Sequence, residues 1–246
     1  MIDTSPSRPE RPTESSSSRP ERSEVERPLY LQSDSPPPPN FNPVARIYRL
    51  TEYLSFGPLL QRARTHFLPQ LPPLHQALVL GDGDGRFLAR LLAREHHLSA
   101  LAVDTSATML RLLRHHCQTD IQRVRTLQAS ALTIIPAPGT DLIVTHFFLD
   151  CFTQPEVDAL AKTLAANTAP GTFWLLSDFA IPPSLILRPF AALYIRFLYL
   201  AFRVLTGLRV THLPDPQSAL AAADFDRIAR HEFLAGFIYT EVWQRR

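Results

Sequence analysis

Short apolar runs alternate with stretches of helical periodicity through the middle of this 246-residue chain. A compact apolar run predicts a buried strand, whereas apolar residues that recur every three or four positions predict a helix. The strands predicted in this way are residues 77–80, 100–104, 124–128, 141–146 and 172–178. The predicted helices are residues 86–96, a helix capped by Thr105 or Ser106 that ends near His116, and residues 154–166. This alternation indicates βαβ units, and hence a parallel sheet with helices on both faces.

The end of the chain breaks the alternation. Residues 226–234 and 237–245 are two strand-like runs joined by Ala235-Gly236. Because such a short connection joins antiparallel strands, we expect a C-terminal hairpin. The predicted fold is therefore α/β, a Rossmann-like doubly wound sheet of seven strands, mostly parallel with an antiparallel C-terminal strand.

Residues 1–43 differ in composition from the rest of the chain. Pro, Ser, Glu and Arg dominate this segment, and the pentapeptide Ser-Arg-Pro-Glu-Arg occurs at Ser7 and again at Ser18. A segment with so little apolar surface cannot offset its ordering entropy, so we expect a disordered tail. Residues 44–71 then carry apolar residues at helical spacing, interrupted at Phe56-Gly57-Pro58, which predicts two short helices. One domain, residues 44–246, follows the tail.

Charge, cysteine content and the N-terminus narrow the possible functions. A formal net charge of +2 gives no bulk electrostatic reason to expect a nucleic-acid partner. Two cysteines, Cys117 and Cys151, are too few for a disulfide framework or a cysteine-based metal site. The paired histidines at 96–97 and 115–116 point in different directions on a helix, so we expect no metal. The N-terminus lacks a charged start followed by an apolar run, so the expected location is cytoplasmic.

The strand at residues 77–80 ends in the turn Gly81-Asp-Gly-Asp-Gly85. In a doubly wound sheet, ligands bind at the carboxyl ends of the strands, where this turn is placed. Gly81 and Gly83 lack Cβ atoms, so the backbone can approach a ligand closely, and Asp82 or Asp84 is placed to meet a cationic amino group. Asp104 ends the next strand, where its carboxylate can accept hydrogen bonds from both hydroxyls of a ribose.

Both NAD and S-adenosylmethionine enzymes use a glycine turn with an acidic partner. The dinucleotide fingerprint requires a third glycine three positions after the second, and here that position is Arg86. The spacing Gly-x-Gly-x-Gly instead favours S-adenosylmethionine. An NAD-dependent oxidoreductase and a glycine turn without ligand stay as alternatives.

With these motifs the chain resembles the class I S-adenosylmethionine-dependent methyltransferases over residues 44–246. The nearest likeness is to the branch that contains the ubiquinone and menaquinone C-methyltransferases. The matching residues are Ile47-Tyr48, Ser55-Phe56-Gly57, Val79 to Gly85, Val103-Asp104, Gly207-Leu208 and Leu213-Pro214-Asp215.

The resemblance implies S-adenosyl-L-methionine as the cofactor and a set of residues that bind it. It places Asp104 on the ribose and Thr105 and Met109 beside the adenine. Ser130 and Ala131 would face the adenine edge, where family members usually carry Asp, so a hydroxyl would accept that hydrogen bond without charge assistance. The expected cofactor-binding residues are Tyr48, Gly81, Asp82, Gly83, Asp104, Thr105, Met109, Ser130, Ala131 and His146.

The acceptor is expected near Thr145 to Cys151, which follow the strand at 141–146. Methyl transfer from a sulfonium depends largely on positioning, but a phenol, an enol or a carbon acid also needs a base. His146 is the first candidate for that catalytic role and Asp150 the second. The alternative is that His146 contacts the cofactor or a backbone group. Phe147 and Phe148 are expected to pack in the core and beside the cofactor.

Residues 184–206 form the most unusual segment, a long apolar helix that carries three arginines. Arg188, Arg196 and Arg203 recur at spacings of eight and seven, which places them on one face of the helix, within about 100°. Such a helix suits a lid over the active site or a surface that rests on a membrane. Packing against its own domain or against a second copy in a homodimer is the equal alternative. An apolar acceptor is favoured in either case.

The combined prediction is a cytoplasmic, metal-independent methyltransferase. It would transfer the methyl group of S-adenosylmethionine to a small, largely apolar acceptor, such as a quinone precursor, a phenol or a lipid-like compound. Two alternatives stay open: an NAD-dependent oxidoreductase, and a non-catalytic scaffold whose proline-rich tail recruits a partner.

Overall fold

The computed structural model describes residues 58–206, 210 and 212–246, all within the second of two compact units, Pro38–Arg246. The first predicted helix of the domain, Tyr48 and the Gly207-Leu208 pair lie outside the described residues. The disordered tail over residues 1–43 stays a prediction.

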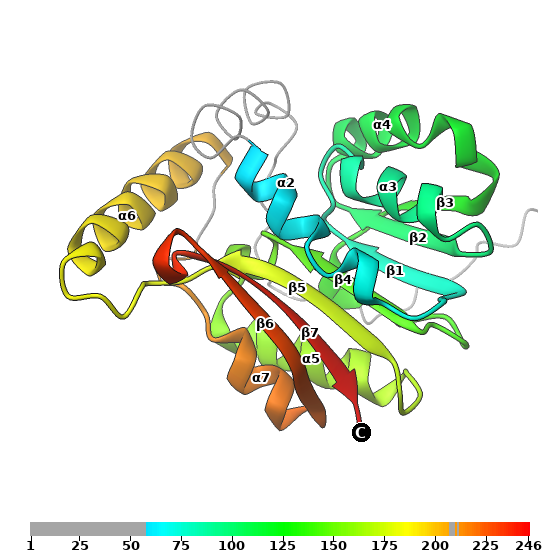
Figure 1. The fold of residues 1–246 in the computed structure, drawn as a ribbon. Coiled ribbons are helices and arrows are strands. Elements are labelled where there is room, and N and C mark those ends of the chain that lie inside the picture. The colour runs from blue at the N-terminus through cyan, green and yellow to red at the C-terminus, as the bar shows by residue number, and fades with distance from the viewer. Residues whose placement is uncertain (1–57, 207–209, 211) are drawn as a thin grey trace, which may run out of the picture. The chain divides into compact units, whose positions relative to one another are not determined.

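Seven strands form one sheet in the order β3-β2-β1-β4-β5-β7-β6 (Figure 1). The first five pair in parallel, β7 pairs antiparallel with both β5 and β6, and the predicted fold class is confirmed. The strands are β1 (Gln76–Leu80), β2 (Ser99–Asp104), β3 (Val124–Gln128), β4 (Leu142–His146), β5 (Phe173–Phe179), β6 (Phe225–Phe233) and β7 (Ile238–Arg245). Reversal of strand order beside β1 creates the switch point at which doubly wound sheets bind ligands.

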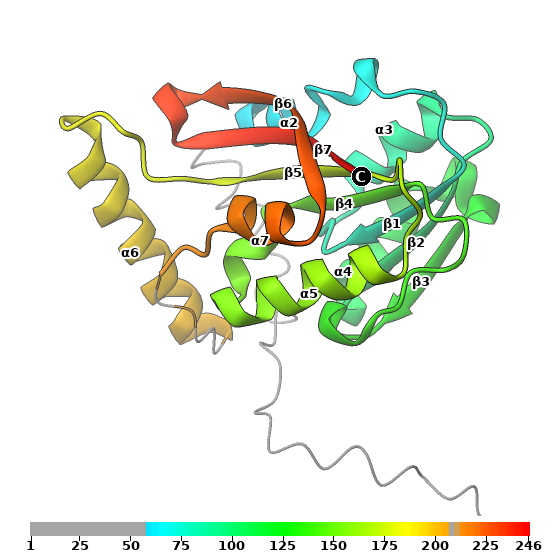
Figure 2. The same ribbon diagram turned by 90° about the horizontal axis from the view of Figure 1, so that it is seen from below.

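Helices cover both faces of the sheet. Figures 1 and 2 show α3 and α4 on one face, α5 and α7 on the other, and α6 beyond the carboxyl end of β5. The helices are α2 (Pro58–Thr65), α3 (Arg86–Arg94), α4 (Ala107–His116), α5 (Gln154–Ala166), α6 (Leu187–Thr206) and α7 (Pro216–Ala222). Short 3₁₀ helices are η2 (Leu68–Gln70), η3 (Gln118–Arg123), η4 (Ala131–Thr133), η5 (Leu149–Cys151) and η6 (Leu234–Gly236).

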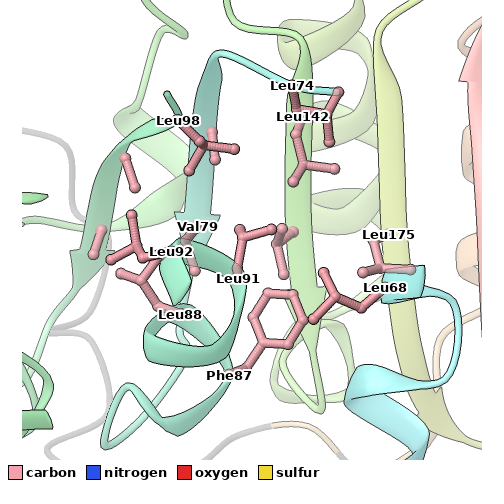
Figure 3. Packing of buried hydrophobic residues seen from close by; sticks show 14 of the residues in the cluster. Leu68, Leu74, Val79, Phe87, Leu88, Leu91, Leu92, Leu98, Leu142 and Leu175 are labelled. Carbon is pink, nitrogen blue, oxygen red and sulfur yellow. The ribbon is translucent and has the colours of Figure 1, made fainter. Parts of the chain in front are cut away.

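Alternate residues of the strands build two separate cores. Val79 of β1 and Leu142 of β4 pack with Leu88 and Leu91 of α3 in the cluster of Figure 3. The intervening strand residues point to the opposite face, where Leu78 and others pack against α5 and α7. Strands buried on both faces read as continuous apolar runs, which explains why they were recognised from the sequence.

The predicted bounds of strands and helices agree with the structure to within one residue except at α3, α6 and α7. The helix expected over residues 86–96 ends at Arg94, because Glu95 leaves the helical region at φ −98°, ψ 89°. Helix α7 was not predicted. It has seven residues, and its N-terminus is capped by Asp215, whose carboxylate accepts from the backbone N–H groups of Gln217 and Ser218. Such a short helix gives too little periodicity to recognise.

Helix α6 confirms the helix expected over residues 184–206, with its first helical residue at Leu187. Ala191, Ile195 and Tyr199 lie four residues apart and pack in a third cluster together with α2 and the start of β7. Within the described ranges, no helix combines the length and the apolar character needed to cross a membrane.

Candidate functional site

The carboxyl ends of β1, β2 and β4 meet at one edge of the sheet. Gly81, Asp104 and His146 stand at these ends, and the backbone N–H of Gly81 donates to the carbonyl of Val103 at 2.9 Å. The sheet order thus brings together three residues that the sequence places far apart. This edge is the candidate site.

The three glycines of the turn all lie in the left-handed region, at φ +65°, +63° and +84°. A Cβ on Gly81 would stand 2.1 Å from the Phe148 ring, and one on Gly85 would stand 2.6 Å from the Leu113 side chain. Packing therefore requires glycine at both positions. A Cβ on Gly83 would meet no atom within 4 Å, so the middle of the turn borders open space.

The two acids of the turn are engaged with the following helix. Asp82 is buried, and its Oδ2 accepts from the backbone N–H of Leu88 at 3.0 Å, in the first turn of α3. Asp84 pairs with the Arg86 guanidinium, with Oδ1 3.0 Å from Nε. The expected contact of Asp82 with a cationic amino group stays a prediction. The sequence did not reveal its other task, which is to satisfy an N–H group at the start of α3.

Asp104 ends β2 beside the start of α4. Its Oδ1 accepts from the backbone N–H of Ser106 at 2.7 Å, and the Ser106 hydroxyl in turn accepts from the N–H of Met109. Burial raises the pKa of Asp104 to about 6, against the lowering effect of backbone hydrogen bonds from Ser106 and Thr105. A carboxylate has about four acceptor sites, so Asp104 keeps capacity for ribose hydroxyls.

The residues expected around the adenine lie on the two sides of β3's carboxyl end. Met109 is buried on α4, and the carbonyl of Thr105 accepts from Gln128 Nε2 at 3.1 Å. The Ser130 hydroxyl accepts from the backbone N–H of Leu132 at 3.3 Å and so caps η4, which begins at the buried Ala131. Ser130 therefore has a local structural role in addition to its predicted contact with adenine.

His146 ends β4 with its side chain 2% exposed. Neither of its ring nitrogens has a hydrogen-bond partner among the described residues. The ring contacts Phe87 of α3 edge to face, with 4.5 Å between centroids. Burial, and secondarily the charge of Arg64, lower its pKa well below 6.5, so the imidazole is neutral. A buried group with two unused polar atoms is what a polar ligand at this edge would satisfy.

Phe147 and Phe148 directly follow β4, and both rings contact neighbouring side chains. Phe147 has φ +52°, a left-handed conformation that is rare for a bulky residue. The guanidinium of Arg64 lies over its ring, 5.2 Å from the centroid. The ring of Phe148 contacts that of Phe152, with centroids 5.0 Å apart. These contacts agree with the expected core packing of both phenylalanines, and their packing beside the cofactor stays a prediction.

Asp150 and Asp178 are two buried carboxyls at the same edge, 8% and 2% exposed. Asp150 lies in η5, and Asp178 is the penultimate residue of β5. Asp178 was not among the residues singled out in the sequence. It could have been, since it ends a predicted strand just as Asp104 does.

The described residues also include side chains of the types that bind metals. No group of three or more His, Cys, Asp or Glu side chains there is arranged to hold a metal ion. Cys117 and Cys151 are both free thiols.

Comparison with known proteins identifies the central part of the fold. Residues 77–171 match a family model described as a methyltransferase domain. This range includes the glycine turn, Asp104, Ser130 and His146. No curated protein sequence matches the chain significantly.

Solved structures of methyltransferases share the fold. An O-methyltransferase family 2 protein from Planctomyces limnophilus, in complex with apigenin, has a TM-score of 0.62 at 18% identity, covering 82% of this chain and 62% of its own. CalO1, a methyltransferase of calicheamicin biosynthesis in its SAH-bound form, has a TM-score of 0.60 at 17% identity. The match covers 84% of this chain and 60% of CalO1. The N-methyltransferase NodS from Bradyrhizobium japonicum has a TM-score of 0.53 at 12% identity. The match covers 76% of this chain and 96% of NodS.

The chain thus spans about three fifths of the length of the two larger relatives. The fold is that of the class I S-adenosylmethionine-dependent methyltransferases, which agrees with the resemblance found in the sequence. The placement nearest to the ubiquinone and menaquinone branch is not confirmed by these matches.

Proposed function

We propose that this chain is an S-adenosylmethionine-dependent methyltransferase. The observation that carries the proposal is the open middle of the glycine turn at Gly83, beside Asp104 on the neighbouring strand end. The matched methyltransferase domain over residues 77–171 supports it. That match gives no support to an NAD-dependent oxidoreductase or a non-catalytic scaffold.

The residues present fit the cofactor at three points. The open space beside Gly83 leaves room for the amino-acid end, Asp104 would bind the ribose, and the unused nitrogens of His146 would provide a polar contact. The predicted adenine contacts are Thr105, Met109, Ser130 and Ala131, and Tyr48 stays a prediction outside the described residues. When bound, S-adenosylmethionine supplies an electrophilic methyl group on a positively charged sulfur.

His146 remains a candidate for both roles that the sequence suggested. Its neutral imidazole is in the state that a general base requires. Its burial against Phe87, on the α3 face of the sheet, supports the alternative role as a contact for the cofactor.

We propose a small, largely apolar acceptor with an ionisable hydroxyl. The apigenin complex of the Planctomyces relative supports a phenolic compound over a lipid-like one. Helix α6 would form one wall of the acceptor site, because the hydroxyl of its Tyr199 donates to the carbonyl of Asp150 at 3.1 Å. A quinone precursor belongs to the same chemical class. Membrane contact and homodimer formation through α6 stay predictions.

Titration calorimetry with S-adenosylhomocysteine and with NAD tests the proposal. We expect S-adenosylhomocysteine to bind and NAD to bind far more weakly. Replacing Asp104 by Ala removes two charge-assisted hydrogen bonds to ribose, each worth about 1.5–3 kcal/mol, so affinity should fall by more than tenfold. Asp226→Ala, a change at an exposed carboxylate of β6, serves as the control. Preferential binding of NAD, or equal affinity in the Asp104 variant, would contradict the proposal.

A further inference from the structure

Asp150, in η5 after β4, and Asp178, in the next strand β5, lie near enough for the charge of Asp150 to act on Asp178. Strands β4 and β5 are paired, and the backbone N–H of Phe147 extends this pairing to the carbonyl of Ser177 at 2.7 Å. The chain then turns into η5, which carries Asp150 over the end of β5. The backbone N–H groups of Leu149 and Asp150 face the carboxyl of Asp178 as a result.

One carboxyl oxygen of the pair has no hydrogen-bond donor in the described part of the chain. Asp178 Oδ1 accepts from the backbone N–H of Phe179 at 2.8 Å, but Oδ2 is buried and has no partner among the described residues. Asp150 Oδ1 accepts from the thiol of Cys151 at 3.6 Å, a weak donor. A buried carboxylate oxygen without a partner is costly, so this arrangement calls for a proton or a ligand.

The groups that face the pair carry no compensating positive charge. They are Cys151, Tyr199 of α6 and Tyr239 of β7, whose pKa values are all raised by burial and by the two acids. Among the described residues, no arginine or lysine contributes to the pKa of either carboxyl. Ionisation of both carboxyls in such surroundings costs free energy, because two like charges repel strongly where the dielectric constant is low.

The pKa values of the two carboxyls are raised by different combinations of causes. Burial and the charge of Asp150 raise the pKa of Asp178 well above 3.8. Burial raises the pKa of Asp150 to about 6, against hydrogen bonds from Cys151 and the backbone. Both causes acting on Asp178 favour its protonated form, so the pair favours a proton on Asp178 and the negative charge on Asp150.

The position of the pair relates it to the candidate cofactor site. The charge of Asp104 acts on Cys151 together with those of Asp150 and Asp178, so the three carboxyls lie around one thiol. His146 points to the opposite face of the sheet from Asp178. Leu142 and Val144 of β4 pack on the α3 face, and His146 follows the same alternation, whereas Asp178 continues the α5 face of Trp174 and Leu176.

We propose that Asp150 is the general base that removes the proton of a hydroxyl acceptor, with Asp178 as its positioning residue. The proposal rests on the proposed methyltransferase function. The acceptor O–H bond breaks, its proton moves to a carboxylate oxygen of Asp150, and the electron pair left on oxygen forms the new C–O bond. The pair of the broken C–S bond stays on sulfur, which leaves S-adenosylhomocysteine, and Asp150 later loses its proton to solvent. Asp178 stays protonated and keeps the charge of the pair at one.

A carboxyl NMR titration of the full chain tests the pair without any acceptor. In protein labelled with ¹³C at aspartate, we expect Asp104 and Asp150 to titrate near 6 and Asp178 well above 3.8. The pKa of Asp178 should fall in Asp150→Asn because the like charge is gone. Asp226→Asn should leave the titration unchanged. If Asp178 titrates near 3.8 in the wild type, or if its pKa is unchanged in Asp150→Asn, the proposal is wrong.

Methyl transfer to phenols of different acidity tests the catalytic role. The probes are catechol, apigenin and 4-nitrocatechol, the last of which ionises near neutral pH and needs a base least. For the first two, Asp150→Asn should lower the rate by about 10²–10⁴-fold, with a smaller loss for 4-nitrocatechol. Asp178→Asn should keep most of the activity, since an amide resembles the protonated carboxyl, and the wild-type rate should rise with pH through about 6.

Each other outcome contradicts a specific step. An equal loss for all three phenols, no loss in Asp150→Asn, or an equal loss in Asp178→Asn would overturn the assignment of Asp150 and Asp178. Binding of S-adenosylhomocysteine without turnover of any phenol would overturn the hydroxyl acceptor and leave the cofactor site standing. Absence of S-adenosylhomocysteine binding would instead overturn the proposed function.

Discussion

Glycine is required at Gly81, Gly83 and Gly85 for different reasons. Gly81 and Gly85 lie against side chains that a Cβ would strike, namely Phe148 and Leu113. Gly83 borders open space, and a positive φ is the property that it shares with Gly81 and Gly85. The first and third glycines therefore serve packing, and the middle one is free to serve a ligand.

Alanine substitutions separate these roles. Gly83→Ala should cost about 1–2 kcal/mol of unfolding free energy, the cost of a left-handed Cβ, and should also weaken S-adenosylhomocysteine binding. Gly171→Ala is the matched control, with φ +89° and nothing within 4 Å of its Cβ, and should lose stability alone. Urea unfolding and calorimetry measure the two effects. If Gly83→Ala bound the ligand as tightly as Gly171→Ala does, the turn would not be the cofactor site.

The protonation of Asp104 gives the proposed site a pH dependence. With a pKa of about 6, Asp104 is ionised at pH 7.5 and becomes protonated as the pH falls through 6. A protonated carboxyl accepts fewer hydrogen bonds, so S-adenosylhomocysteine affinity should fall about tenfold for each pH unit below 6. The contribution of Asp104 to folding stability has the opposite sign. Because its folded pKa is raised, stability decreases as the pH rises from 3.8 to 6.

Calorimetry between pH 5 and pH 8 measures this dependence. Asp104→Asn cannot titrate, so the wild-type decrease should be absent from that variant. An equal decrease in both proteins would assign the effect to another group.

At the scale of elements, α6 presents apolar side chains in two directions. Ala191, Ile195 and Tyr199 pack inward, whereas other apolar side chains are exposed to solvent. The exposed ones on the helix are Leu187, Phe190, Leu193, Phe197 and Leu200. Arg188 and Arg196 are exposed too, and residues 184–206 contain no Asp or Glu. An apolar row with positive charge fits an anionic lipid surface.

The double variant Phe190→Ser with Phe197→Ser tests this surface. Burial of each ring in lipid contributes at least about 1.5 kcal/mol, so the variant should bind phosphatidylglycerol vesicles more than tenfold less tightly. Ile228→Ser, at an exposed apolar position of β6, is the control and should bind as the wild type does. Sedimentation velocity distinguishes the alternative. A dimer that the double variant abolishes, with no vesicle binding by the wild type, would assign the surface to a second copy.

At the scale of the whole molecule, the sequence was sufficient to predict the sheet. Buried parallel strands leave unbroken apolar runs such as residues 77–80, and the short connection at 235–236 required a hairpin. The position of β7 between β5 and β6 could not be deduced, because strand order depends on contacts distant in sequence. The same limit applied to the site. Asp104 was found by its spacing from the turn, but the approach of Asp178 to Asp150 exists only in the folded sheet.

The contact between Gly81 and Phe148 links the two halves of the proposed reaction. The Phe148 ring occupies the place of a side chain on Gly81, so the donor turn and the segment leading to Asp150 share one van der Waals surface. A ligand that displaces this ring changes the free energy of the turn as well. Thermodynamic reciprocity would then make the affinity for one proposed substrate depend on the presence of the other, by equal factors in both directions. Binding of donor and acceptor would be cooperative through a single aromatic ring.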